Sequence, residues 1–573
     1  MLSILLIWIY IFVLTSVAGF LLQVTIYKNN FKEQSFSNPI LLSVIGYCII
    51  TAAISIYALF FKVALVANLL LILSEVIGCI IFKKQFMVMF QSGVQKIKEI
   101  NAKQLFIFLI IIFNVLFMNI KGVYFDSDTG LYHAQVIQWI EKYPAIPGLG
   151  NLYPNYAFNS SFFITSALFS FTFLKDFSYH VLNSYFLLIL LVYLIQNING
   201  KEYRNAIYAF LVIPTFYFFK LDAALPYPDI IIYILEIFVF MVIMEKIKSN
   251  SLQKFDFKSL IICLIILTCI TTKLSALPVI FVLPLMLFYA RNIIKAKHLF
   301  TLCSFALIVM VPWLVRNVIL SGYLVFPYPS IDVFNYDWKV PYNEAVITKS
   351  WICSHARILE QYDDFQLTFK QWFPIWFGNQ LWVNLISLLI AVVGMVFLSV
   401  IIFTKKALSK IASRSLFYFG VTYLLCILFW FMMAPAFRFG QAYIFVCIAI
   451  IIFYCLEILM FNKKLIQNSI VILLLLFAGY SSIWPIKMIA SGEINLKQHL
   501  IYPEIKYKPI VVVEKNLNGL IISMPVGNRR CWNQPIPCTP RLYNSIQLRD
   551  TNLSSGFKIV RADSVTVSAS YFK

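Results

Sequence analysis

The stretch from Trp382 to Phe403 determines the fold class, and it reads WVNLISLLIAVVGMVFLSVIIF. Its 22 residues carry no charged side chain, and a helix of this length crosses the ~30 Å hydrocarbon core of a bilayer. Similar apolar runs recur along the chain, of which 61% is hydrophobic and 12% charged. A soluble domain is about half apolar and a quarter charged. The sequence therefore predicts an all-helical, polytopic membrane protein.

The apolar runs long enough to count as membrane segments number about fourteen. They lie near residues 2–25, 39–60, 62–82, 104–120, 178–198, 205–219, 226–246, 257–272, 275–290, 299–320, 382–403, 416–433, 438–459 and 466–484. A further run, 159–174, is shorter, and counting it as a crossing would reverse the side of every later basic connection. We interpret it as a partial or interfacial helix.

Lys and Arg give the chain a formal charge of +21, and they concentrate in alternate connections. These basic residues are Lys28 and Lys32; Lys83, Lys84, Lys96, Lys98 and Lys103; Lys201 and Arg204; Lys246, Lys248, Lys254 and Lys258; Arg291, Lys295 and Lys297; Lys405, Lys406, Lys410 and Arg414; and Lys463 and Lys464. Basic connections face the cytoplasm. The charge thus reflects topology, no nucleic-acid partner is expected, and both termini and the loops 121–177 and 321–381 are predicted to lie outside.

This topology divides the chain into a membrane domain, residues 1–484, and an extracytoplasmic tail, residues 485–573. The first apolar run has no basic residues before it and no cleavage site, so it is expected to stay as an anchor. The tail holds short β-prone runs at 510–513, 520–524 and 564–568, which predict a small α+β or β-rich unit. Cys531 and Cys538 flank two prolines, and a disulfide between them is favoured over a zinc site.

The densest polar motif is YFDSDTGLYHAQ at residues 124–135. Behind it, apolar residues recur with helical spacing at Tyr132, Val136, Trp139, Ile140 and Tyr143. We expect an amphipathic helix on the external membrane surface, with Asp128 at its N-cap.

Asp128 has two interpretations. It either only caps this helix or acts as a weak base, because a helix N-terminus favours an ionised carboxylate. Asp126 is interpreted as a loop residue facing water. His133 is either an external surface residue or an acid, base or ligand.

Four further ionisable residues stand at the predicted outer ends of helices: Asp229, Lys273, Arg316 and Arg438. Single cations in such places usually extend toward the interface. Several of them on one side favour a site for an anionic headgroup, because Arg and Lys both bind phosphate oxygens. Tyr132, Asp229 and Asn317 are the candidates for further substrate contacts.

This arrangement resembles that of the GT-C glycosyltransferases, in which an external acidic motif precedes an amphipathic helix. The chain also looks like an uncharacterised bacterial family of polytopic membrane proteins with an Asp-Thr/Ser-Gly-Leu-Tyr-His motif, here residues 128–133. Further matching motifs are residues 147–152 (PGLGNL), 337–341 (DWKVP) and 530–540 (RCWNQPIPCTP). One departure is Ala436, where the resemblance leads us to expect an acidic residue.

The resemblance implies a glycosyltransferase in a bacterial plasma membrane, with a polyprenyl-phosphate sugar as donor and a cell-envelope acceptor. Asp128 would then activate the acceptor, and Asp126 would assist it or hold a divalent cation. Arg316, Lys273 and Arg438 would neutralise the departing phosphate. The alternatives are a transporter or flippase, a polymerase or ligase for lipid-linked oligosaccharide, and a non-catalytic assembly protein. Glu75 and Glu236, inside apolar segments, are the residues that keep a transporter in view.

Overall fold

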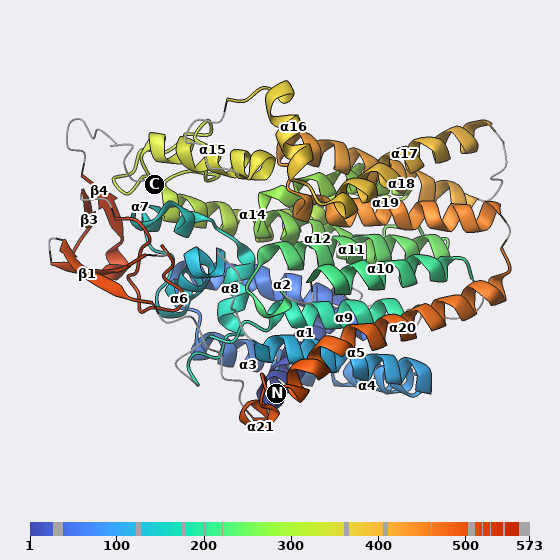
Figure 1. Cartoon of the computed structure of the whole chain (residues 1–573). Coiled ribbons are helices and arrows are strands. Elements are labelled where there is room, and N and C mark those ends of the chain that lie inside the picture. The colour runs from blue at the N-terminus through green and yellow to red at the C-terminus, as the bar shows by residue number, and fades with distance from the viewer. Residues whose placement is uncertain are drawn as a thin grey trace.

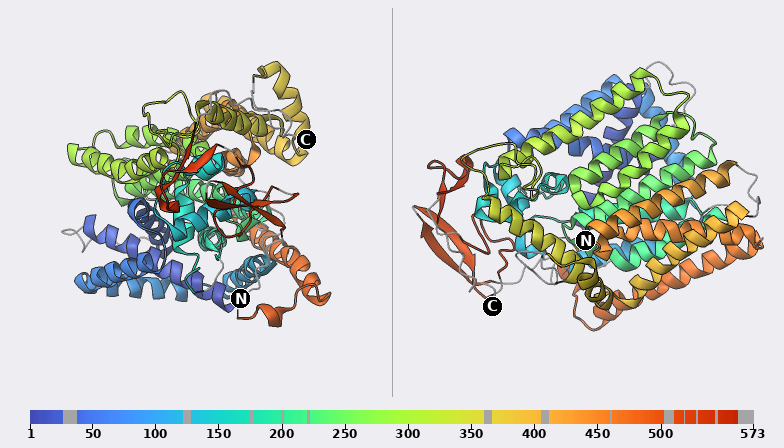
Figure 2. Two further views of the ribbon diagram at one scale, coloured as in Figure 1. Left: turned by 90° about the vertical axis from the view of Figure 1, so that its left-hand side faces the viewer. Right: turned by 90° about the horizontal axis from the view of Figure 1, so that it is seen from above.

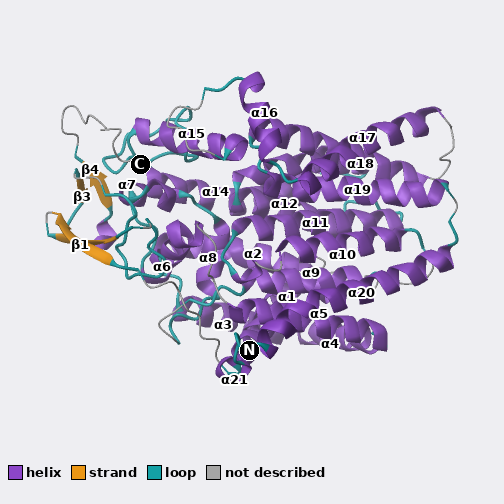
Figure 3. Cartoon of the chain, in the orientation of Figure 1, coloured by secondary structure: helices purple, strands orange, loops and turns teal. Residues whose placement is uncertain are grey.

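The computed structural model describes residues 1–26, 38–121, 128–174, 178–198, 202–219, 222–359, 366–404, 411–459, 461–501, 510–517, 519–527, 529–542 and 545–560. Figure 1 shows long helices aligned along one common direction, with the strands gathered at one end. We call that end of the bundle the strand end. Colouring by secondary structure separates the helical body from the strands and the loops around them (Figure 3).

The first half of the chain contains α1 (Leu2–Ile26), α2 (Pro39–Phe60), α3 (Leu65–Ile81), α4 (Lys83–Lys98), α5 (Ala102–Lys121), η1 (Thr129–His133), α6 (Ala134–Lys142), α7 (Leu149–Leu152), η2 (Pro154–Ala157), α8 (Ser161–Leu168), α9 (Leu182–Gln196), α10 (Arg204–Phe219), η3 (Asp222–Ala224), α11 (Pro228–Lys248), α12 (Phe257–Thr272), η4 (Leu274–Phe281) and α13 (Val282–Ala290). The second half contains α14 (Ala296–Ser321), α15 (Tyr342–Ile358), α16 (Phe369–Asn379), α17 (Trp382–Thr404), α18 (Ile411–Met433), α19 (Phe437–Ile458), α20 (Lys463–Ala490), α21 (Leu496–His499), β1 (Val512–Leu517), β2 (Leu520–Pro525), β3 (Ile546–Leu548), η5 (Leu553–Ser555) and β4 (Phe557–Ile559).

Each of the fourteen predicted segments is helical in the structure, in α1 to α3, α5, α9 to α14 and α17 to α20. Among the described residues, eight helices are long and apolar enough to cross a membrane, or nine if the bent pair α3–α4 forms one span. α9, α12 and the η4–α13 pair are apolar but shorter. The protein is therefore a helical membrane protein, and fourteen crossings remain a prediction.

Burial distinguishes the inner from the outer helices. α11 is buried along almost its whole length, and α9, α12, α18 and α19 pack against it. α17 instead exposes large apolar side chains, such as Leu389 at 62% and Phe403 at 74%. An exposed apolar face of this kind suits contact with lipid. The outer surface of the bundle is thus suited to contact with lipid acyl chains.

The helix α4 was not predicted, because its lysines indicated a connecting loop. It is bent by 99° from α3. Met87, Phe90 and Val94 recur along one face and are 48%, 57% and 37% exposed. A helix forms here because this spacing makes one apolar stripe that can lie along an apolar surface.

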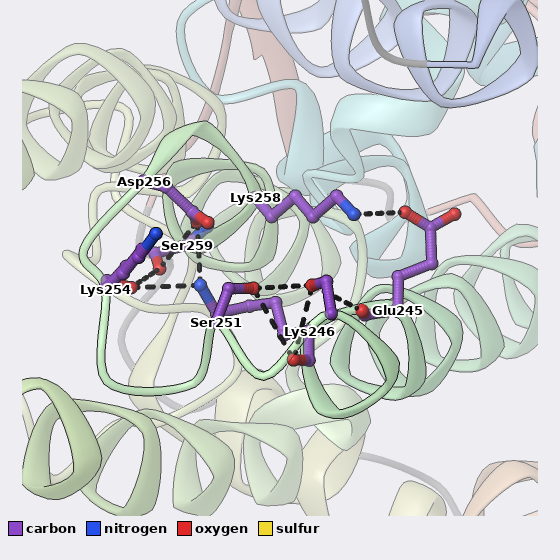
Figure 4. Close-up of polar contacts among 8 residues, drawn as sticks. Glu245, Lys246, Ser251, Lys254, Asp256, Lys258 and Ser259 are labelled. Carbon is purple, nitrogen blue, oxygen red and sulfur yellow. Dashed lines mark hydrogen bonds and ion pairs between the residues drawn. The ribbon is translucent and has the colours of Figure 1, made fainter. Parts of the chain in front are cut away.

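The turn between α11 and α12 is a second basic connection that the structure folds tightly (Figure 4). Lys246 is fully buried, and its Nζ donates to Asp256 Oδ1 at 2.7 Å and to the Lys254 carbonyl at 3.0 Å. Lys258 pairs with Glu245 at 2.7 Å. The α11 helix begins at the strand end, so this turn lies at the other end, ~30 Å away along the helix. Two lysines of the predicted cytoplasmic connection therefore fix a turn rather than an open loop.

The tail contains two antiparallel hairpins: β1–β2 matches the first two predicted β-prone runs, and β3–β4 is a second pair of strands that was not predicted. The run 564–568 lies outside the described residues, as do Lys28, Lys32, Lys201, Lys405, Lys406 and Lys410. α20 continues to Ala490, beyond the predicted boundary at 484. Figure 2 places the strands beyond the ends of the helices in the view from above.

The run 159–174 contains α8, whose eight residues are all buried. A helix of this length is ~12 Å long and cannot cross a bilayer. The expectation of a partial helix is therefore confirmed, but the helix lies inside the protein rather than on its surface.

Candidate functional site

The motif around Asp128 is held in place by the tail. The Trp532 backbone N donates to the Gly130 carbonyl at 2.9 Å. A methyl group on Gly130 would lie 2.6 Å from the Trp532 indole ring, so only glycine allows this approach. Gln135 donates to the carbonyls of Trp532 at 3.0 Å and Gln534 at 2.8 Å. Residues far apart in sequence thus fix the first turns after Asp128.

The other three motifs meet in the same place. Thr539 Oγ1 donates to the Leu152 carbonyl at 3.1 Å. Asn151 Nδ2 donates to the Trp338 carbonyl at 2.8 Å. Cys531 and Cys538 form the expected disulfide, which closes the loop that carries Trp532. The motifs at 147–152, 337–341 and 530–540 therefore act as packing partners that support the segment from Asp128 to His133.

The turn after Asp128 is a π-helix, η1, in which the Ala134 backbone N donates to the Thr129 carbonyl. Short π-helical turns are rare and occur often at functional sites. Asp128 stands at the predicted N-cap, but its side chain makes no capping hydrogen bond. The following helix α6 is buried between α8 and the tail, so its predicted place on an exposed membrane surface is wrong.

Asp128 instead contacts α11 through Tyr227. The Tyr227 hydroxyl donates to Asp128 Oδ2 at 3.4 Å and accepts a hydrogen bond from Arg438 Nη1. Tyr227 precedes Pro228, the first residue of α11, and such a residue is held in an extended conformation. This fixed position lets one hydroxyl group link the carboxylate of Asp128 to the guanidinium of Arg438.

Asp229 is the centre of a second set of contacts. Its Oδ1 accepts from Lys273 Nζ at 2.6 Å, and its Oδ2 lies 3.6 Å from Arg438 Nε. Asp229 is 5% exposed, whereas 31% of the Lys273 side chain and 36% of the Arg438 side chain are accessible. Both cations are nevertheless surrounded by protein atoms on most sides. They therefore remain partly accessible to solvent. We call Asp128, Tyr227, Asp229, Lys273 and Arg438 the charged cluster.

Helix ends explain why these side chains meet. Asp229 lies in the first turn of α11, where the helix dipole favours a carboxylate. Lys273 is the residue that ends α12, and Arg438 is the second residue of α19. Trp430 Nε1 donates to the Ala436 carbonyl at 3.0 Å and fixes the entry into α19. The carboxylate expected at position 436 is absent, and Asp229 is the one that pairs with Arg438.

His133 and Tyr132 lie beside the cluster. His133 is 1% exposed and packs on Phe163 and Tyr227, so the interpretation as an external surface residue is wrong. Burial lowers the pKa of His133 well below its usual value, and Lys273 and Arg438 lower that pKa further, so His133 is neutral. Burial raises the pKa of Tyr132, with a further contribution from Asp128, so the phenol stays protonated.

Two residues of this site were not predicted. Tyr227 stands between two prolines in Leu225-Pro-Tyr-Pro-Asp229, a rigid setting that could have drawn attention to it. His355 is an exposed residue of α15. Partial burial and then the nearby charge of Arg438 lower its pKa, while Asp128 opposes this, so His355 lies near the charged cluster. No spacing in the sequence marks His355.

The remaining candidates lie elsewhere. Arg316 and Asn317, in the last turns of α14, make no hydrogen bond or ion pair with the charged cluster within the described ranges. Asp126 lies outside the described residues. Among the residues that the structure describes, no three His, Cys, Asp or Glu side chains lie close enough together to hold a metal ion. A divalent cation therefore stays an expectation from the sequence.

The fold and the site together define a helical membrane protein with a cluster of ion pairs at the strand end of its bundle. The chain belongs to a family described as a domain of unknown function, DUF8201, whose model matches residues 1–445. No curated protein and no solved structure matches the chain. The functional argument therefore depends on the charged cluster.

Proposed function

We propose that the protein is a membrane glycosyltransferase of the GT-C type, which transfers a sugar from a polyprenyl-phosphate donor to an acceptor hydroxyl group of the cell envelope. The observation that carries this proposal is the single linked cluster, in which Asp128 is joined through Tyr227 to Arg438, and Arg438 and Lys273 share Asp229. A base and two cations within one set of contacts match the needs of a displacement with a phosphate leaving group.

In this mechanism the acceptor oxygen attacks the anomeric carbon with inversion of configuration. The bond between that carbon and the phosphate oxygen breaks, and its electron pair leaves with the polyprenyl phosphate. Asp128 takes the proton of the acceptor hydroxyl. Arg438 and Lys273 stabilise the negative charge of the leaving phosphate, and Tyr227 holds Asp128 and Arg438 at a fixed separation.

The proposed topology supports this reaction. With fourteen crossings and basic connections inside, the charged cluster and both termini face the extracytoplasmic side of a bacterial plasma membrane. Nucleotide sugars are unavailable there, so a lipid-linked donor is the chemically suitable one. The exposed apolar surface of helices such as α17 suits a substrate that stays in the bilayer.

The experiment uses the full chain reconstituted in liposomes with polyprenyl-phosphate sugars and envelope acceptors. Asp128→Asn should lower the transfer rate by about 10²–10⁴-fold, because a positioned general base contributes this much. Asp550→Asn, at an exposed position of the tail, is the matched control and should transfer at the wild-type rate. Equal rates for Asp128→Asn and wild type would exclude Asp128 as the base, and no turnover of any donor by wild type would count against the enzyme.

A transporter or flippase for an anionic lipid-linked substrate is the second candidate. Glu236 lies in the middle of α11, is 1% exposed and accepts a hydrogen bond from Tyr443 at 2.5 Å. Ionisable residues within a membrane bundle often mark a transport path. Movement of a labelled lipid-linked sugar across sealed liposomes without transfer would favour this candidate.

A further inference from the structure

Arg316 is a cation whose surroundings differ from those of the charged cluster. It is 5% exposed, and its guanidinium makes no hydrogen bond, ion pair or aromatic contact with any described residue. An arginine that extends to the interface would keep its head group in water, and Arg316 does not. An unpaired buried charge costs several kcal/mol. Such a cost is accepted where a ligand supplies the missing partner.

The residue after Arg316 is also buried and also has a donor without a partner. Asn317 is 1% exposed, and its Nδ2, a donor, has no partner among the described residues. With 3.6 residues per turn, Trp313, Arg316 and Asn317 share one side of α14. That side packs on the start of α8, because Asn159 Nδ2 donates to the Trp313 carbonyl at 2.8 Å and Trp313 Nε1 donates to the Asn159 carbonyl at 2.7 Å.

The start of α8 adds further donors. Ser160 is the N-cap residue, and its hydroxyl group, 7% exposed as a residue, neither caps the helix nor bonds to another described residue. The unpaired donors near the contact of α14 with the start of α8 are a guanidinium, an amide NH₂ and a hydroxyl, which suit an oxyanion, and one unpaired acceptor, Asn159 Oδ1, lies beside them.

The start of α8 also contacts residues beside the charged cluster. Ser161 Oγ lies 3.1 Å from Thr272 Oγ1, and Thr272 directly precedes Lys273. Phe163, in the first turn of α8, packs on His133 with ring centroids 5.1 Å apart. Lys273 is already paired with Asp229, whereas Arg316 has no carboxylate partner. The two cationic regions thus adjoin the same short helix, and they differ in whether a carboxylate already pairs with the cation.

We infer that Arg316, Asn317 and Ser160 form a second anion-binding site, separate from the charged cluster, whose ligand is a phosphate group. The planar guanidinium binds two phosphate oxygens, and the Asn317 amide and Ser160 hydroxyl donate to the remaining oxygens. The inference does not depend on the proposed reaction, because anion binding is measured without turnover.

The test measures thermal unfolding of the full chain in detergent as inorganic phosphate replaces chloride at constant ionic strength. Phosphate should raise the Tm of the wild type. Arg316→Gln should weaken the apparent phosphate affinity at least tenfold, because hydrogen bonds to a charged group contribute about 1.5–3 kcal/mol. Without phosphate, Arg316→Gln should be at least as stable as wild type, because it removes an unpaired buried charge.

Three further variants complete the test. Arg291→Gln removes an exposed arginine after α13 and should respond to phosphate like the wild type. Lys273→Gln removes a cation of the charged cluster, and adding Arg316→Gln to it should weaken phosphate binding further, because Arg316 belongs to a separate site. Arg316→Lys keeps the charge but loses the planar guanidinium that binds two oxygens, so it should bind phosphate with an intermediate affinity. This variant tests the site even if Arg316→Gln fails to fold. Loss of the response in Lys273→Gln but not in the Arg316 variants, or no response in the wild type, would overturn the inference.

Discussion

Replacing Asp229 with Asn tests the charged cluster most directly. The substitution keeps the shape of the side chain but removes the charge shared by Lys273 at 2.6 Å and Arg438 at 3.6 Å. Breaking a fully buried pair costs 3–5 kcal/mol and an exposed one below 1 kcal/mol. The acid is buried and the two cations are about one-third exposed, so we expect a loss of about 2 kcal/mol in the free energy of unfolding.

The same change should strengthen anion binding. Two neighbouring cations without their carboxylate attract phosphate, so Asp229→Asn should bind inorganic phosphate more tightly than wild type, and this gain should persist in the double variant with Arg316→Gln. Stability is followed by thermal unfolding in detergent, where about 2 kcal/mol corresponds to a fall in Tm on the order of 2 °C for a chain of this length.

The matched control is Asp337→Asn. Asp337 pairs with Arg549 at 2.8 Å, but 50% of the Asp337 side chain is exposed, so its loss should cost below about 1 kcal/mol and leave phosphate binding unchanged. If Asp229→Asn unfolds at the wild-type temperature and binds phosphate no more tightly, Asp229 does not organise the two cations.

Three other perturbations address the tail and a buried histidine. Gly130→Ala places a methyl group 2.6 Å from the Trp532 ring, so about 1–3 kcal/mol of overpacking should loosen the tail, seen as faster limited proteolysis there with the helices intact. The double variant Cys531→Ser and Cys538→Ser should lose about 2.5 kcal/mol of the free energy of unfolding, because the disulfide no longer closes the loop, and its tail should also be cleaved faster than in the wild type. Cleavage at the wild-type rate would show that the tail does not need the disulfide. Burial lowers the pKa of His133 well below its usual value, so its contribution to stability is complete above pH 6.5 and falls by about 1.4 kcal/mol per unit as the pH drops below 6.5; His133→Gln should remove this part of the slope in thermal unfolding.

The helices were predictable because length and apolar content alone make a segment helical in a bilayer. All fourteen predicted segments became helices, yet α4 was missed, because lysines suggested a loop while the stripe of Met87, Phe90 and Val94 supports a helix. Secondary structure thus followed from local composition. The direction in which α4 leaves α3 depends on tertiary packing.

The candidate site was predictable only in part. The sequence placed Asp128, Asp229, Lys273 and Arg438 near the same side, and the structure joins them. It could not show that Arg316 lies outside the charged cluster. A position near the end of a helix predicts how deep a residue lies in the membrane, but not in which direction its side chain points around the helix axis. His355 was missed for a similar reason, since its place beside the cluster depends on how α15 packs.

The contact between the tail and the motif after Asp128 has a consequence for the order of synthesis. Gln135 and Trp532 are bonded although they lie 397 positions apart. A ribosome makes the membrane helices first and the loop with Trp532 near the end of its work. The turn that carries Asp128 therefore lacks the contacts that hold it in place during most of translation. A newly inserted chain can form its helical bundle before the site around Asp128 is complete.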